Sequence, residues 1–263
     1  MKGAIGARLM GHIRLGTLPK SARWYRVVGL IETNPQAARG IAAATLIASE
    51  RYLLDVKDDP ALVRAYGLLV HLMSAARGDN FAGELQRLGL HLEPGTSSIA
   101  FLSGVADAVR RETAAEADGS LAGEFATQSL RRALMDTVAT QSTSLFGSTV
   151  DDLQQAFRAH STEQQFGEVS RLFFGDFVAR VLRSAIDREA PTLLSADGSA
   201  HLIDEVDLHA RQSAAIVQDF AGEWLSKKRY ERAGDITQQD IQGFVAVALR
   251  KLRSEIKREG EAP

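Results

Sequence analysis

The chain has 263 residues, of which 45% are hydrophobic and 24% are charged, and this balance excludes an intrinsically disordered protein. It contains no cysteine, which excludes a disulfide framework, a thiolate nucleophile and a cysteine-bound metal. No apolar run reaches the roughly 18–20 residues of a membrane span, and the basic start of the chain lacks the apolar stretch of a secretory signal, so a cytoplasmic protein is expected.

Charge is unevenly distributed along the sequence. The segment 1–31 contains no acidic residue and carries a net charge of +6, and the segment 227–258 carries +5. The whole chain carries −2, so the remainder of it, mostly the middle, carries −13. We expect the two basic ends either to bind an anionic partner or to pack on the acidic middle of the same molecule.

Helix signals follow one another along the first half of the chain. Residues 25–31 fit a helical face and a short strand equally well. Cap and stop signals predict further helices over about 35–56, 60–77, 81–88 and 98–117. Two of these begin with a cap residue followed by proline, at Asn34-Pro35 and at Asp59-Pro60, where the missing N–H of proline costs nothing.

The second half of the chain is predicted to be helical as well. The expected helices cover 121–146, a segment after Ser148, about 162–189, 202–230 and a segment after Thr237. Ser148, Ser161 and Thr237 are each followed three positions later by an acidic or amide side chain, which is the spacing of a capping box.

These elements define the expected fold class. No stretch alternates with period two and no internal repeat is visible, so we predict an all-α, multi-helix bundle of about eight to ten helices. The turn at Asp118-Gly119 separates an N-terminal helical lobe, 1–117, from a C-terminal helical lobe, 120–263. The two parts either pack as lobes or form one continuous domain.

Arg64 and His71 form the first candidate site. Seven residues are nearly two helical turns, so both side chains lie on one face, where they could orient a phosphodiester and move a proton. This pair resembles the Arg-x4-6-His signature of the HEPN ribonucleases, which are small helical bundles active as dimers. The resemblance implies a metal-independent ribonuclease with Arg64 and His71 as catalytic residues. The alternative is a surface arginine beside a histidine with a local hydrogen bond.

His201, Glu205 and His209 form the second candidate site, because they follow one another at four-residue spacing. If one helix includes all three, they can present imidazole and carboxylate ligands to zinc or another transition metal. The alternative is a solvated first helical turn, in which acidic residues are favoured by the helix dipole. No other pattern indicates a metal or a cofactor, so none is expected.

The basic ends supply the candidate nucleic-acid contacts. Arg23 and Arg26 flank Trp24 and Tyr25, and arginine beside aromatic side chains can bind phosphate and stack on bases. Basic residues of the C-terminal region could grip a nucleic-acid backbone: Lys227, Lys228, Arg229, Arg250, Lys251 and Arg253. The alternative is structural, since cations are also favourable in the last turns of helices.

Taken together, the sequence favours a protein that works by binding. It contains neither a glycine-rich phosphate loop nor a Gly-x-Ser-x-Gly nucleophile motif. We expect a non-enzymatic helical adaptor or accessory subunit of a larger assembly, with a protein partner or a second copy of the chain, and with nucleic acid as a second ligand at the basic ends. The alternatives are the HEPN-like ribonuclease and a nucleic-acid-binding protein.

Overall fold

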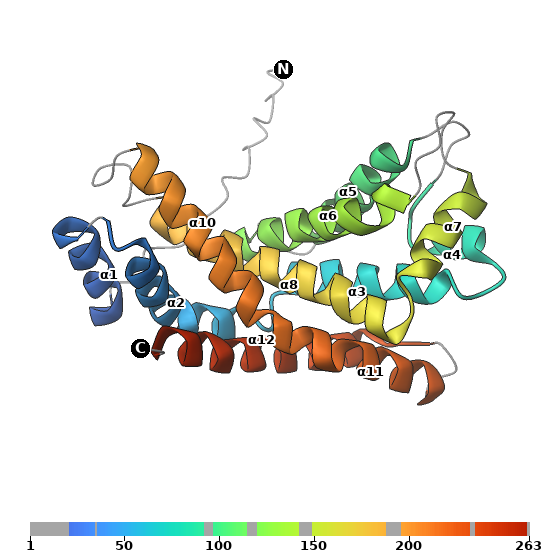
Figure 1. The fold of residues 1–263 in the computed structure, drawn as a ribbon. Coiled ribbons are helices and arrows are strands. Elements are labelled where there is room, and N and C mark those ends of the chain that lie inside the picture. Colours follow the sequence, from blue (N-terminus) through green and yellow to red (C-terminus); the bar gives the residue numbers. More distant parts are fainter. Residues whose placement is uncertain are drawn as a thin grey trace, which may run out of the picture.

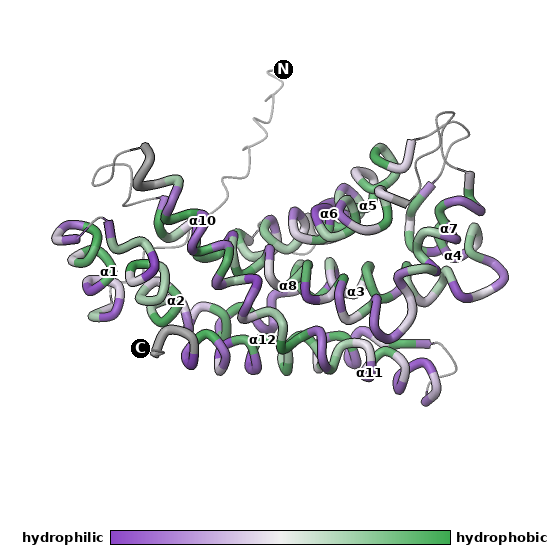
Figure 2. Tube along the Cα trace, in the orientation of Figure 1, coloured by the Kyte–Doolittle hydropathy of each residue, from purple (hydrophilic) through white to green (hydrophobic). Residues whose placement is uncertain are grey.

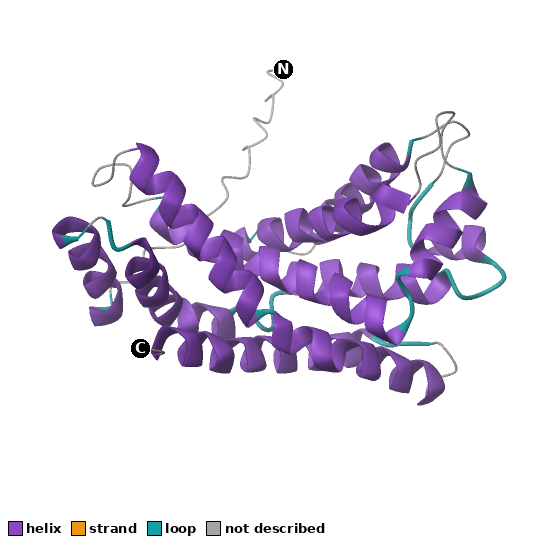
Figure 3. Ribbon diagram, viewed as in Figure 1, coloured by secondary structure: helices purple, strands orange, loops and turns teal. Residues whose placement is uncertain are grey.

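A computed structural model of the protein describes residues 21–34, 36–91, 97–114, 120–141, 149–187, 196–231 and 235–261. These residues form helices joined by short connections and contain no strand, which confirms the all-α bundle (Figure 3). The helices are α1 (Ala22–Thr33), α2 (Ala38–Asp55), α3 (Pro60–Ala75), α4 (Phe81–Arg87), α5 (Ser98–Ala114), α6 (Leu121–Gln141), α7 (Val150–Ala159), α8 (Glu163–Ile186), α10 (Ala196–Ser213), α11 (Ala215–Glu231) and α12 (Gln238–Glu261). None of the helices in these segments is long and apolar enough to cross a membrane.

The helices are arranged around α8 and α3 (Figure 1). Helix α8 packs against α6, α10 and α11, while α3 packs against α5, α6 and α12. At one end of the bundle α2 lies between α1, α10 and α12. Helices from both sides of the predicted lobe boundary therefore pack on each other, as α3 does on α6 and α2 on α12. The turn at Asp118-Gly119 itself lies outside the described residues.

An aromatic cluster holds the centre of the bundle together. Tyr66 of α3 stacks on Phe244 of α12 with ring centroids 5.1 Å apart, and it also contacts Phe173 and Phe174 of α8 at 5.4 and 5.1 Å. The Tyr66 hydroxyl is hydrogen-bonded to the hydroxyl of Ser170 at 3.0 Å, which satisfies a polar group that is fully buried. The hydropathy colouring follows this pattern, with apolar faces turned towards the neighbouring helices (Figure 2).

Two predicted helix starts are confirmed. The Asp59 carboxylate accepts hydrogen bonds from the backbone N–H groups of Ala61 and Leu62, both at 3.0 Å, and Pro60 opens α3. At the start of α12, Thr237 and Asp240 form the predicted capping box, with each side chain accepting from the other residue's backbone N–H at 3.2 and 3.1 Å.

Three other predicted starts are wrong in position. The box predicted at Ser148 is formed one residue later, by Thr149 with Asp152, and Thr162 rather than Ser161 caps α8. Asn34 ends α1 instead of opening α2, since its backbone N–H donates to Leu30. Neighbouring hydroxyl residues offer equivalent caps in the sequence, and the packing of the following helix selects one of them.

The predicted helix over 202–230 is also wrong, because it is divided at Ala214 into α10 and α11 (Figure 1). No glycine or proline stands at this break, so no local signal marks it. Both halves pack on α8 and α12, and α10 packs extensively on α2 as well. Since no local signal marks the break, we attribute it to tertiary packing.

Two glycines allow α8 and α11 to approach closely. A Cβ atom at Gly222 would lie 2.0 Å from the carbonyl oxygen of Glu163, and one at Gly167 would lie 2.5 Å from the carbonyl oxygen of Gln218. Each glycine thus faces the backbone of the other helix, and no larger residue fits at this distance.

The capping box of α12 leads to a first prediction. Replacing Thr237 by alanine is expected to lower the free energy of unfolding by about 1 kcal/mol, because the Asp240 backbone N–H loses its acceptor. Urea unfolding at pH 7 measures the change. Thr237→Ser keeps the hydroxyl and should retain most of the stability, so equal stability of the alanine and serine variants would contradict the capping role.

Candidate anion-binding site

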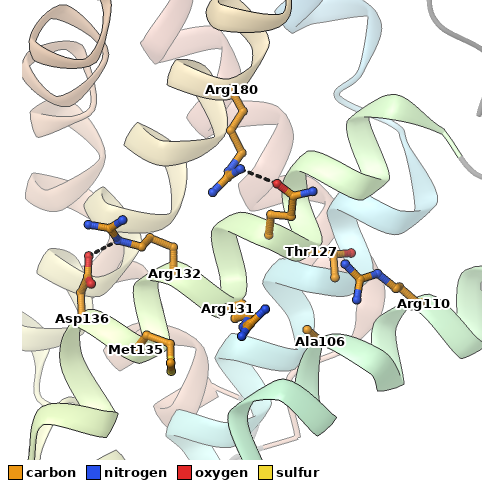
Figure 4. Close-up of a pocket in the computed structure, with 9 residues that line it drawn as sticks. Ala106, Arg110, Thr127, Arg131, Arg132, Met135, Asp136 and Arg180 are labelled. Carbon is orange, nitrogen blue, oxygen red and sulfur yellow. Dashed lines mark hydrogen bonds and ion pairs between the residues drawn. The ribbon is translucent and has the colours of Figure 1, made fainter. Parts of the chain in front are cut away.

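A groove of about 490 Å³ between α5, α6 and α8 is lined by four arginines, and we call it the arginine groove. Arg110 comes from α5, Arg131 and Arg132 come from α6, and Arg180 comes from α8. Figure 4 shows these side chains around the hollow, with Arg132 turned towards Asp136 and Arg110 on the other side of Arg131. The other lining residues are Ala106, Thr127, Gln128, Met135 and Asp136.

The side chain of Arg110 is held in place by two carboxylates. Arg110 donates to Glu124 from Nε at 3.3 Å and from Nη2 at 2.9 Å, and to Asp107 from Nη1 at 3.2 Å. The hydrogen bond to Glu124 raises the pKa of Arg110 above its ordinary value. Glu124 also accepts from the Gln128 amide at 2.7 Å, so α5 and α6 are joined through this carboxylate.

Arg180 is held in the same way on the opposite wall. Its Nε donates to Asp176 at 2.5 Å and its Nη1 donates to the side-chain oxygen of Gln128. Asp176 accepts a further hydrogen bond from the Ser129 hydroxyl at 2.8 Å. A continuous polar network therefore crosses from α5 through α6 to α8, and it orders two of the four guanidinium groups before any ligand arrives.

The two arginines of α6 are less constrained. Arg132 donates to Asp136 from Nε at 2.6 Å, which leaves both of its terminal nitrogens available. Arg131 is exposed and makes no hydrogen bond or ion pair within the described part of the chain. Its five N–H donors and its charge are therefore open to a ligand in the groove.

The charge of the lining decides what the groove can hold. Four arginines and one aspartate line the hollow, but Asp107, Glu124, Asp136 and Asp176 are bonded to three of these arginines. Arg131 therefore carries the one lining charge that no carboxylate of the described residues offsets. A second hollow of about 310 Å³, between α8 and α11, is lined by the acidic residues Glu163, Asp219 and Glu223 instead. Arginine forks match carboxylate and phosphate oxygens, so the arginine groove is suited to an anion.

Sequence reasoning missed this site. Each of the four arginines, taken alone, is typical of a solvated helix face, and three of them have a carboxylate three or four positions away on their own helix. One signal was present, because Gln128, Arg131, Arg132 and Met135 share a face of α6 at helical spacing. The meeting of that face with Arg110 and Arg180 depends on the packing of three helices.

The candidate ribonuclease residues both lie on α3, as predicted. Arg64 forms an ion pair with Glu112 of α5 at 3.1 Å. His71 is half-buried, and burial lowers its pKa, with Arg87 acting in the same direction. The two side chains thus have different neighbours, and their joint action on RNA stays a prediction.

The candidate metal ligands lie on one helix, α10. His201 is exposed, Glu205 is half-buried and His209 is only 6% exposed. Within the segments that the structure describes, no group of three or more His, Asp or Glu side chains has an arrangement that could hold a metal ion.

Two of the candidate nucleic-acid residues, one from each basic end, meet on Glu50. This glutamate of α2 is 5% exposed, and it accepts from Arg23 of α1 at 2.7 Å and from Arg253 of α12. Burial alone would raise the pKa of Glu50, but the hydrogen bonds from Arg253 and Arg23 outweigh it and lower the pKa. These two residues thus pair with a carboxylate of the same chain, and their contact with nucleic acid stays a prediction.

Arg229 also serves the fold. It donates to the backbone carbonyl of Met73, near the end of α3, at 2.9 Å and to that of Ser161 at 2.8 Å. Burial lowers the pKa of Arg229 to about 10, with Arg77 acting in the same direction. Its guanidinium is therefore committed to helix-end carbonyls and is poorly placed for a phosphate.

The remaining candidate nucleic-acid residues lie on the surface to different degrees. Lys228 forms ion pairs with Asp240 and Glu231 at 3.0 and 3.1 Å, and Lys227 lies 3.9 Å from Glu231. The ammonium group of Lys251 lies 5.0 Å above the ring of Phe220. Arg26 and Arg250 are exposed, and the basic residues before position 21 lie outside the described residues.

Comparison with known proteins gives no relative. No family model, no curated protein and no solved structure matches the chain. The arginine groove and the fold around it are therefore the basis for a functional proposal.

Proposed function

We propose that the protein is a non-enzymatic helical adaptor or accessory subunit, and that the arginine groove is where it binds an anionic group of its partner. The observation that carries this proposal is that four arginines from three helices line one hollow, and that Arg131 among them has no carboxylate partner in the described residues. Arginine stays protonated at neutral pH and only donates hydrogen bonds, so these side chains hold an anion but do not exchange protons with it.

The network behind the groove supports a recognition role. Arg110 and Arg180 are each held by two side chains, and this order reduces the conformational entropy lost when a ligand binds. Arg131 then supplies a charge that no described carboxylate neutralises. Arg110 and Arg180 are therefore held in place, while the guanidinium of Arg131 is available to a ligand.

A second candidate is nucleic-acid binding by the C-terminal helices. The observation in its favour is that Lys227, Arg250 and Lys251 are exposed on α11 and α12. Such a surface would bind any polyanion, with an affinity that falls steeply as salt is added.

Charge reversal at the groove tests the proposal. A fluorescent glutamate-rich peptide, a fluorescent nucleotide and a fluorescent oligonucleotide serve as anionic probes in anisotropy titrations at low salt. Arg131→Glu is expected to weaken binding of the preferred probe by roughly 30-fold, because it replaces an attractive charge by a repulsive one. Arg131 makes no ion pair in the described structure, so the variant should fold normally.

Two matched variants complete the experiment. Arg39→Glu makes the same charge change at an exposed position of α2 outside the groove and should leave binding almost unchanged. Lys227→Glu combined with Arg250→Glu tests the second candidate. The proposal is wrong if no probe binds, or if Arg39→Glu weakens binding as much as Arg131→Glu; loss of binding only in the Lys227 and Arg250 variant would favour nucleic-acid binding by α11 and α12.

A further inference from the structure

Helices α11 and α12 pack on each other along one edge of the bundle, and each leaves part of its surface exposed there (Figure 1). We infer that this shared face binds the same face of a second copy of the chain, so that two protomers form a symmetric dimer. The inference uses no residue of the arginine groove and is independent of what that groove binds.

The centre of the face is apolar. Phe220 and Trp224 of α11 pack on Phe244 of α12 with ring centroids 5.2 and 4.5 Å apart, and both remain half-buried. Val247, one turn further along α12, is 38% exposed. We call Phe220, Trp224 and Val247 the aromatic strip. Aromatic side chains are enriched in the centres of protein interfaces, and this strip offers two of them.

Acidic side chains border the strip on the side of α8. Asp219 and Glu223 each precede one of the two aromatic residues by one position, so they form a neighbouring row along α11. This row is turned towards α8, where Glu163 completes the lining of the second hollow, of about 310 Å³. None of the three carboxylates forms an ion pair with another residue that the structure describes.

Basic side chains border the strip on the opposite side, on α12. The ammonium group of Lys251 lies 5.0 Å from the centre of the Phe220 ring, and the neighbouring Arg250 is exposed. Neither of them forms an ion pair within the described segments. Asp219 and Lys251 thus both lie beside Phe220, on opposite sides of the aromatic strip.

This arrangement of charge is self-complementary. A two-fold axis that runs along the strip brings the strips of two protomers together and exchanges the two sides of the face. Helix α11 of each protomer then lies over α12 of the other, and Asp219 of one protomer faces Lys251 of the other. An apolar centre between two rows of opposite charges is the usual anatomy of an interface, and contact through the same patch closes the assembly at two copies.

Charge also favours a second copy over a nucleic acid on this face. A phosphate backbone that bound Arg250 and Lys251 would come close to Asp219 across the strip, and this carboxylate repels it. A second copy meets the basic row with carboxylates and the acidic row with cations, so both rows are attracted.

An exchange of charge between the two sides tests the inference. Sedimentation velocity over a concentration series should show a dimer of the full chain, which weakens as salt is added. Asp219→Lys alone and Lys251→Asp alone should each weaken dimerisation by roughly 30-fold, because two pairs per dimer change from attraction to repulsion. An equimolar mixture of the two variants should form a heterodimer about as tightly as the wild-type protein, since a lysine then faces an aspartate in both pairs.

The controls and the outcomes are specific to this face. Both substituted positions are exposed, so the variants should fold, and recovery in the mixture itself requires two folded variants. Glu32→Lys on α1 and Arg39→Glu on α2 make similar charge changes at exposed positions and should leave dimerisation unchanged. A wild-type protein that stays monomeric, single variants that dimerise as it does, or a mixture that fails to associate would each overturn the inference. Oligonucleotide binding by a monomer, lost in Lys251→Asp, would assign the face to nucleic acid instead.

Discussion

Replacing Gly222 by alanine is expected to lower the free energy of unfolding by about 3 kcal/mol, at the upper end of the usual cost of overpacking. The added Cβ would lie 2.0 Å from the carbonyl oxygen of Glu163 and 2.6 Å from its carbonyl carbon. Both are backbone atoms that cannot rotate away, so α8 and α11 must separate. The gain of about 1 kcal/mol in helix propensity is too small to offset this separation.

Gly243 provides the matched control for the α8–α11 contact. It lies on an exposed position of α12, and a Cβ there would meet nothing within 4 Å. Gly243→Ala should therefore stabilise the protein by about 0.5–1 kcal/mol through helix propensity alone. Urea unfolding of the two variants should give changes of opposite sign, and a Gly222 variant as stable as the Gly243 variant would show that the helices do not approach so closely.

Removing the carboxylate of Glu50 is expected to have the second large effect. Glu50→Ala should lower the free energy of unfolding by about 2–3 kcal/mol, because Arg23 and Arg253 lose their shared partner. The loss stays below that of a fully buried pair, since the two arginine side chains are 57% and 42% exposed and are partly solvated. Glu223→Ala removes an exposed carboxylate and should change stability by less than about 0.5 kcal/mol.

The contribution of Glu50 should depend on pH in a defined direction. Its pKa in the folded protein is lowered from 4.5, so the carboxylate contributes fully above that value and its contribution falls as the pH drops through and below it. The difference in stability between the wild-type protein and Glu50→Ala should be constant from neutral pH to mildly acidic pH and shrink below about pH 4.5. A difference that grows on acidification would contradict this account.

The sequence predicted two helix starts correctly, and both depend on local chemistry alone. Asp59 and Thr237 cap their helices as expected because a cap needs only one side chain and the next few N–H groups. The break at Ala214 was not predictable in this way, because no glycine or proline stands there and the break is a matter of tertiary packing.

The candidate site was less accessible to sequence reasoning. The sequence predicted nucleic-acid contacts at the basic residues near the two ends. In the structure, Arg23 and Arg253 form ion pairs with Glu50, and Arg229 donates to the backbone carbonyl of Met73. The arginines of the groove are spread over three helices, and nothing in their local spacing distinguishes them from solvated residues. A site formed by the packing of distant segments becomes visible only when that packing is known.

The contact between Arg253 and Glu50 also has a consequence for how the protein is made. The two residues are 203 positions apart, and α12 covers one side of α2. At about 5–20 residues per second, a ribosome needs roughly 10–40 s to add the residues between them. During that time the side of α2 that α12 covers lacks this neighbour, so we expect the contact between the two helices to form only after α12 has been made.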